Sequence, residues 1–237
     1  MPNPLSLISL AAAARGGAID GIDSRQLVAA GVTMLQRCAP LVRELAGARG
    51  AVLLENSPAY LVALAACEGH GAVLLDPRGT AEDIARTLDE MRGRVVFTVE
   101  RYEGSLGDGV ARVLLDELPG HVVFVHGDER RRVDVGSHFG LEIEGEEESG
   151  GSDEEAVVAR ETAGAPFQSY THRELLEAAR GMVSAAGIEE GNEVSAPVPF
   201  HEARGLAYGL LAPLLAGARV VTLPAPGEAE PPSDQLL

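Results

Sequence analysis

The sequence contains no lysine and no tryptophan, and it has only two cysteines. All 19 basic residues are therefore arginine, so the chain cannot itself supply a Schiff-base amine or the lysine that often holds a phosphate. Cys38 and Cys67 lie far apart on apolar-periodic segments and belong to no CxxC pattern. We predict two buried free thiols, and we expect no metal site.

Positive charge and aromatic residues are also scarce. The 36 acidic residues give a net charge of −17, which excludes sequence-independent binding to nucleic acid or to an anionic membrane because phosphates would be repelled. Aromatic residues make up only 4% of the chain, too few for a base-stacking platform. No apolar run approaches the roughly 20 residues of a membrane span. The apolar run 5–14 follows no basic residue, so we predict an amphipathic helix rather than a signal peptide, and a cytoplasmic protein.

Short apolar runs alternate with helical patterns along most of the chain. In residues 24–45, apolar side chains recur every three or four positions, as on one face of a helix. Ser57 with Pro58, and Thr80 with Asp83, are typical helix starts. This alternation predicts an α/β fold with a doubly wound parallel sheet. Apolar runs typical of strands occupy residues 51–54, 72–77, 94–99, 111–118, 121–127, 155–164, 192–200 and 218–224.

Composition suggests four parts in the chain. We expect a first α/β segment over residues 1–127 and a second over 156–224. Residues 128–155, which end in "EIEGEEESGGSDEE", are predicted to be an acidic flexible linker because they cannot bury enough apolar surface to offset the entropy of ordering. They lack the ligand spacing of an EF-hand. The Pro-rich acidic residues 225–237 are predicted to be a disordered tail.

Three separated segments resemble a known family. They are "ENSPAYLVALAACEGHGAVLLDPRGTAEDIARTL", "THRELL" and "PVPFHEARGLAYGLLAPLLAGARVVTLP". In order and spacing, from about residue 18 to 224, they are similar to acyl-CoA synthetases and other adenylate-forming (AMP-binding) enzymes. The resemblance implies the partial N-terminal region of that fold, built from flavodoxin-like sheets. It also implies an ATP-dependent ligase activity, in which a carboxylate is adenylated and then passed to a thiol such as coenzyme A.

The family's phosphate loop, TSGTTGxPKG, aligns with residues 159–168. Thr162, Gly164 and Pro166 match it, and the resemblance implies that they bind the nucleotide phosphates.

Three positions of the loop differ. Arg160 stands where the family has Ser, Glu161 where it has its first Gly, and Phe167 where it has Lys. A carboxylate among phosphates adds repulsion of up to ~4 kcal/mol at an effective dielectric near 20, and Phe removes the compensating cation. The stretch reads as a strand turning through a loop into a helix, and we predict a degenerate remnant of the phosphate loop.

Of the other residues on which the family's activity depends, some have no counterpart in this sequence and others have a counterpart whose role is open. The motifs that bind magnesium, adenine and ribose, and the catalytic Lys, would all follow Leu237, so we expect a truncated pseudoenzyme without catalytic residues. ATP and magnesium are expected as cofactors only if the family activity survives. The resemblance implies that Phe200 and His201 line an acyl pocket. The alternative is that His201 is a packed or capping residue at a strand-to-helix turn.

These observations favour a non-catalytic binding or regulatory module. Two alternatives stay open at this point. One is half of a split acyl-CoA ligase completed by another chain, and the other is a small acyl- or nucleotide-binding domain. We also expect a homo-oligomer or a protein partner to cover an apolar face, with the segment 203–216 as the candidate surface.

Overall fold

The computed structural model describes residues 15–42, 49–67, 71–102, 104, 106, 109–115, 121–134 and 155–223; the side chains of 38–42, 121, 155 and 156 are excluded. The predicted N-terminal helix, most of the predicted linker and the tail 225–237 lie outside the described residues. The same holds for the side chain of Cys38. Cys67 is buried and forms no disulfide, as predicted.

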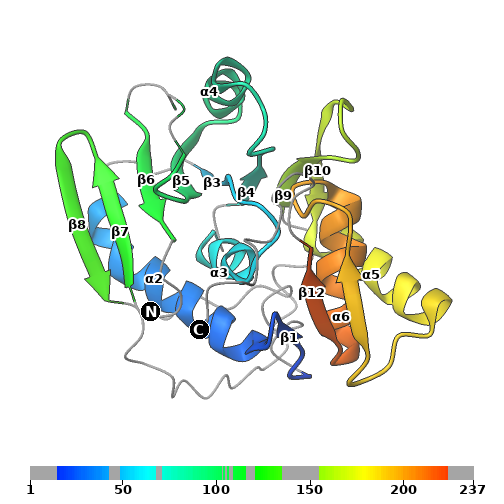
Figure 1. The fold of residues 1–237 in the computed structure, drawn as a ribbon. Coiled ribbons are helices and arrows are strands. Elements are labelled where there is room, and N and C mark those ends of the chain that lie inside the picture. Colours follow the sequence, from blue (N-terminus) through cyan, green and yellow to red (C-terminus); the bar gives the residue numbers. More distant parts are fainter. Residues whose placement is uncertain are drawn as a thin grey trace, which may run out of the picture.

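A large mixed sheet runs across the molecule (Figure 1). The strands β9, β4, β3, β5 and β6 are mutually parallel, and antiparallel strands flank them on both sides. This arrangement confirms the predicted α/β class and adds antiparallel edges to it. In spatial order the strands are β10 (Phe167–Thr171), β9 (Glu155–Arg160), β4 (Ala72–Leu74), β3 (Arg49–Val52), β5 (Gly93–Thr98), β6 (Ala111–Leu114), β7 (His121–His126) and β8 (Glu129–Asp134).

A small sheet joins the beginning of the described chain to its end. Its order is β11 (Glu193–Ala196), β12 (Arg219–Thr222), β1 (Ala18–Ile19) and β2 (Ile22–Asp23). The first three strands are parallel and β2 is antiparallel. Asp20, which follows β1, strengthens the junction by accepting a hydrogen bond from the Thr222 backbone amide at 2.9 Å.

Local sequence sets the ends of several helices. Thr80 accepts a hydrogen bond from the amide of Asp83, and Gly187 ends α5 in the left-handed conformation at φ 62°. Pro58 is the first residue of α3, but the Ser57 side chain makes no capping bond. The helices are α2 (Ser24–Val42), α3 (Pro58–Ala66), α4 (Ala81–Glu90), α5 (His172–Ala186), the π-helical η2 (Gly205–Leu211) and α6 (Ala212–Ala216).

Helix α3 forms the centre of the core. All its residues from Ala59 to Ala66 are buried, as expected of a helix that is apolar on every face. Figure 1 shows α3 in the middle of the molecule, with α5, α6 and the small sheet to one side. Helix α2 packs closely on it at Gly31, where an added Cβ would lie 2.5 Å from the Val62 carbonyl oxygen. No described helix is both long and apolar enough to cross a lipid bilayer.

The structure corrects three expectations about organisation. Residues 129–134 form β8, so the predicted linker does not begin at residue 128. Strands β9 and β10 extend the large sheet, while β1 joins the small one, so the boundary at residue 156 does not separate the two sheets. Most of the segment 203–216 is buried, including Leu210 at 0% exposure, and the interpretation as an uncovered apolar surface was wrong.

Candidate functional site

The segment that aligns with a phosphate loop is a β-hairpin turn between β9 and β10. It does not lead directly from strand to helix, because residues 167–171 first pair antiparallel with β9 and α5 begins only at His172. The Thr162 carbonyl accepts a hydrogen bond from the amide of Ala165 at 3.1 Å, and Gly164 adopts φ +80°. Thr162, Gly164 and Pro166 are all exposed.

The two bulky substitutions in this hairpin contact each other. Arg160 and Phe167 are paired across the strands, and the Arg160 guanidinium carbon lies 4.6 Å from the centroid of the Phe167 ring. This is a cation–π contact, which holds the guanidinium against an apolar surface. The neighbouring Glu161 is exposed.

A second connection, residues 196–200, is held by Asn56 at the start of α3. The Asn56 amide nitrogen donates hydrogen bonds to the carbonyl oxygens of Ala196 at 3.2 Å and Val198 at 3.0 Å. Its amide oxygen accepts one from the Phe200 backbone at 2.7 Å. One side chain thus links the loop of the small sheet to the central helix.

Phe200 is a core residue. It is completely buried, and its ring packs edge-to-face on Tyr60, with centroids 5.5 Å apart and planes at 72°. It does not line the cavity that its neighbour His201 lines. The structure therefore separates the two residues that the sequence had paired in one acyl pocket.

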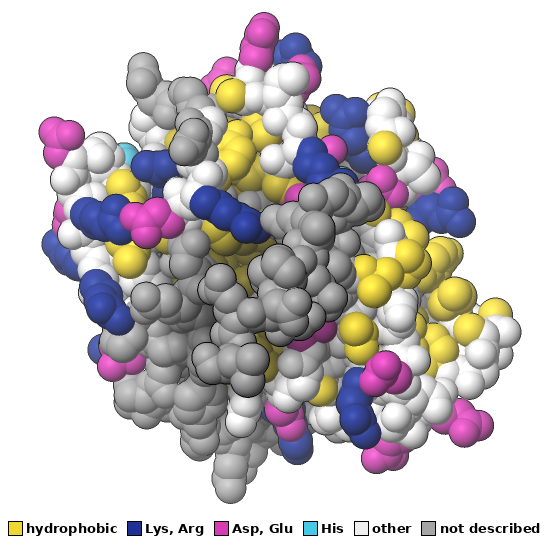
Figure 2. Space-filling model, in the orientation of Figure 1, with side chains coloured by type: hydrophobic (Ala, Val, Ile, Leu, Met, Phe, Trp, Pro, Cys, Tyr) yellow, Lys and Arg dark blue, Asp and Glu magenta, His cyan; other side chains and the backbone are white. Residues whose placement is uncertain are grey.

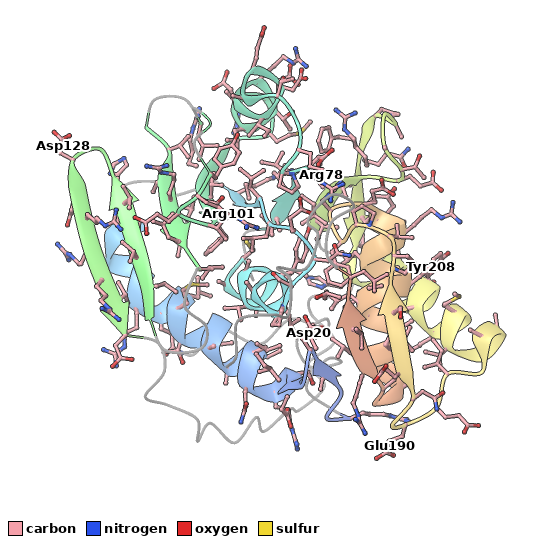
Figure 3. The ribbon with its side chains drawn as sticks, viewed as in Figure 1. Asp20, Arg78, Arg101, Asp128, Glu190 and Tyr208 are labelled. Atoms are coloured by element: carbon pink, nitrogen blue, oxygen red, sulfur yellow. The ribbon has the colours of Figure 1, made fainter. Side chains whose placement is uncertain are left out.

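A cavity of about 390 Å³ lies between the hairpin, the end of β4, helix α4 and the segment that follows Phe200. It brings Gly164 and His201 to one site, whereas Thr162 and Pro166 are not among its walls. Its apolar walls come from Leu74, Leu75, Ile84 and Phe167, and its ionisable walls from Asp76, Asp83, Arg160, His201 and Glu202. Arg78, labelled in Figure 3, pairs with Glu55 near this end of β4.

Carboxylates dominate the charge of the cavity. Asp83 is already engaged, since it accepts from the Thr80 hydroxyl at 2.8 Å and pairs with Arg86, and these partners lower its pKa. Asp76 accepts from the Arg78 backbone amide at 2.9 Å and is half exposed. Glu202 is only 9% exposed. Arg160 is the only cationic side chain among these walls.

The surroundings of His201 lower its pKa, which favours the neutral imidazole. Burial is the main cause and lowers its pKa below 6.5, although the carboxylates of Asp76 and Glu202 oppose that shift. The His201 Nε2 lies 3.9 Å from an Asp76 oxygen, too far for a hydrogen bond, and its side chain is 13% exposed. His201 is thus a half-buried wall of the cavity.

Sequence reasoning missed Asn56 and the role of Glu202. Asn56 stands inside the quoted "ENSPAY", directly before the predicted helix start, but its partners are more than 100 positions away. Glu202 directly follows His201 in the sequence, but no pattern there marks it as a wall of the cavity. No group of three or more His, Cys, Asp or Glu side chains in the described part of the chain could hold a metal ion.

The fold is that of the N-terminal part of adenylate-forming enzymes. Neither a protein-family model nor a curated protein sequence matches this chain. Among solved structures, the chain is similar to IdnL1, with 21% identity and a TM-score of 0.66, over 91% of this chain and 41% of that one. It is also similar to the nonribosomal peptide synthetase FmoA3, with 17% identity and a TM-score of 0.66, over 94% and 23%.

A third similar structure is MatB from Rhodopseudomonas palustris, with 16% identity and a TM-score of 0.63, over 91% of this chain and 44% of that one. The chain thus spans less than half the length of each of these three proteins.

Proposed function

We propose that this protein is a non-catalytic relative of the adenylate-forming enzymes that binds a small molecule and does not activate carboxylates with ATP. The observation that carries the proposal is the hairpin, where Arg160 is stacked on Phe167 and Glu161 replaces a glycine. A phosphate-binding turn needs free amide groups and a mobile cation, and neither substitution provides them.

The rest of the site also disfavours a triphosphate. The chain has no lysine, and Asp76 and Glu202 would face the anion across the cavity. The N-terminus of α5, which follows the hairpin, is occupied by its own capping box. Thr171 accepts from the amide of Glu174, and the Glu174 carboxylate accepts from the amide of Thr171 at 2.8 Å. This helix end therefore has less capacity to bind phosphate.

A binding role is favoured over a purely structural one by the cavity itself. Its volume of about 390 Å³ lies within the range of small-molecule sites, and it combines apolar walls with a few ionisable groups. Among similar structures, MatB has been solved with ATP bound. That property is not transferred here, because the hairpin chemistry differs.

The proposal is tested by ATP–pyrophosphate exchange with short, long and aromatic carboxylic acids. Exchange is expected to stay at the background level for the purified chain. The matched control is Thr162→Ala, which removes the one hydroxyl of the family loop that this hairpin keeps. Exchange clearly above that control, with any acid, contradicts the proposal.

A further inference from the structure

We propose that the cavity binds a small organic cation, a primary amine or guanidinium that carries an apolar group. This inference rests on the proposed binding function and names the class of ligand for the same site. It depends on three features of the walls, namely a carboxylate without a partner among the described residues, a second carboxylate on the same cavity, and an apolar floor.

The first feature is Glu202. Glu202 is 9% exposed and lines the cavity. Within the described ranges, no group donates a hydrogen bond to its carboxylate and no cation pairs with it. The Glu202 carboxylate oxygens are not among the buried side-chain atoms that lack a partner, so they are open to the cavity that Glu202 lines. A cation that also donates hydrogen bonds can pair with them there.

The second feature is the imbalance between carboxylates and cations. Asp76 faces the same cavity, and its side chain is 49% exposed, so it can turn toward a ligand. The lowered pKa of His201 favours its neutral form, and the Arg160 guanidinium keeps its positive charge against the Phe167 ring. Asp83 pairs with Arg86. Three carboxylates thus line the cavity with one guanidinium, and an ammonium or guanidinium of a ligand can donate to Asp76 or to Glu202.

The third feature is the apolar floor. Leu74, Leu75 and Ile84 are at most 3% exposed and line the cavity together with the Phe167 ring. A ligand body of methylene or aromatic groups would bury apolar surface there. A bare metal ion fits less well, because no three potential metal ligands come together in the described residues.

The test is isothermal titration of the whole chain at pH 7.5 with three probes of one shape. These are phenethylamine, 2-phenylethanol and 3-phenylpropanoate. In each, a two-carbon chain joins a phenyl ring to the end group, which is an ammonium, a neutral hydroxyl or a carboxylate, respectively. The amine is expected to bind at least about tenfold more tightly than the alcohol, and the acid is expected not to bind.

Variants assign the effect to the carboxylates. Glu202→Gln should weaken amine binding by about 10- to 100-fold. Glu177→Gln, on the exposed face of α5, is the matched control and should bind like the original chain. If Glu202→Gln does not fold, as judged by circular dichroism, Asp76→Asn at the more exposed carboxylate replaces it and should weaken binding at least several-fold.

The outcomes separate this inference from the proposed function. Equal binding of the amine and the alcohol, tighter binding of the acid, or undiminished amine binding in the folded carboxylate variants overturns the cation site. Absence of binding by all three probes overturns it as well, and in each of these cases the proposed lack of adenylation still stands. Pyrophosphate exchange above background overturns the proposed function alone.

Discussion

The hairpin turn that lines the cavity and the connection that precedes the wall residue His201 are built in opposite ways. Residues 196–200 are fixed by three hydrogen bonds to Asn56, by the buried ring of Phe200 and by a close approach to Gly205. The hairpin turn 161–166 is mostly exposed, and an added Cβ at Gly164 would meet no atom within 4 Å. The connection 196–200 supports the core, and the exposed turn contributes Ala163 and Gly164 to the wall of the cavity.

Under the proposed function, this difference would let the fold persist while the turn departs from the family's phosphate loop. Substitutions in an exposed turn cost little stability, whereas those at a packed junction cost much. Glu161 lies in the exposed turn, whereas Arg160 and Phe167 lie in the flanking strands and are half-buried. The predictions below test this contrast, beginning with the largest expected effect.

Gly205→Ala should destabilise the protein by about 3 kcal/mol or more, because the new Cβ would lie 1.9 Å from the Pro199 carbonyl oxygen. Chemical denaturation monitored by circular dichroism measures the free energy of unfolding. The matched control is Gly181→Ala on α5, where nothing lies within 4 Å. There the greater helix propensity of Ala should stabilise the fold by about 0.5–1 kcal/mol. Equal effects at both sites would show that the 196–200 connection is not tightly packed.

Asn56→Ala should lower the free energy of unfolding by about 2–3 kcal/mol, since it leaves three backbone groups of the 196–200 connection without their partner. Ser57→Ala, at the neighbouring residue, is the control, because the Ser57 side chain makes no capping hydrogen bond. Its effect should stay within about 0.5 kcal/mol in the same denaturation assay. A larger loss for Ser57→Ala than for Asn56→Ala would reverse this assignment.

Gly164→Ala tests the exposed connection and should cost only about 1–2 kcal/mol. The cost comes from the positive φ of +80° and not from any clash. Gly164→Asn should cost less, because Asn adopts this backbone conformation more readily. The same denaturation series is used. An effect as large as that of Gly205→Ala would mean that the hairpin is as constrained as the packed junction.

His201 should make stability depend on pH near neutrality. Its pKa is lower in the folded chain than the 6.5 of an exposed histidine, so the unfolded chain binds a proton more readily. Its contribution is therefore fully present above about pH 6.5 and is lost as the pH falls through the lower folded value. His201→Gln should flatten that part of the stability curve. An unchanged curve in the variant would contradict the assignment of a buried neutral imidazole.

The parallel strands and main helices were predictable because their burial appears in the sequence as apolar runs and helical periodicity. The apolar run "AVLL" at residues 72–75, for example, directly marks the buried β4 (Ala72–Leu74). Strand β8, with the sequence ERRRVD, could not be predicted in this way, because it is an edge strand and exposes most of its side chains. Strand β10, with the sequence FQSYT, is the other edge strand of this sheet and has no buried residue. Strand β1 has only two residues, and its partner β12 lies about 200 positions later in the sequence, so no local pattern indicates that they pair.

The candidate site was predictable only in part. The sequence pointed to Gly164 and His201, and the structure places both on one cavity. It could not show that Phe200 turns into the core or that Glu202 turns toward the cavity, since both depend on the tertiary packing of α3, β4 and the hairpin. The predicted oligomer or protein partner and the cytoplasmic location remain predictions. Figure 2 shows hydrophobic side chains on the side of α5, and the exposed Val198, Tyr208 and Leu223 are starting points for testing a partner.

The most direct test of the central claim is calorimetric titration of magnesium-ATP into the original chain and into the triple variant Arg160→Ser, Glu161→Gly, Phe167→Lys. The variant restores the three family residues of the hairpin while leaving the packed connection at Asn56 intact. The account predicts no saturable binding to the original chain and tighter, measurable binding to the variant. Saturable binding of ATP to the original chain, with no gain in the triple variant, would contradict it.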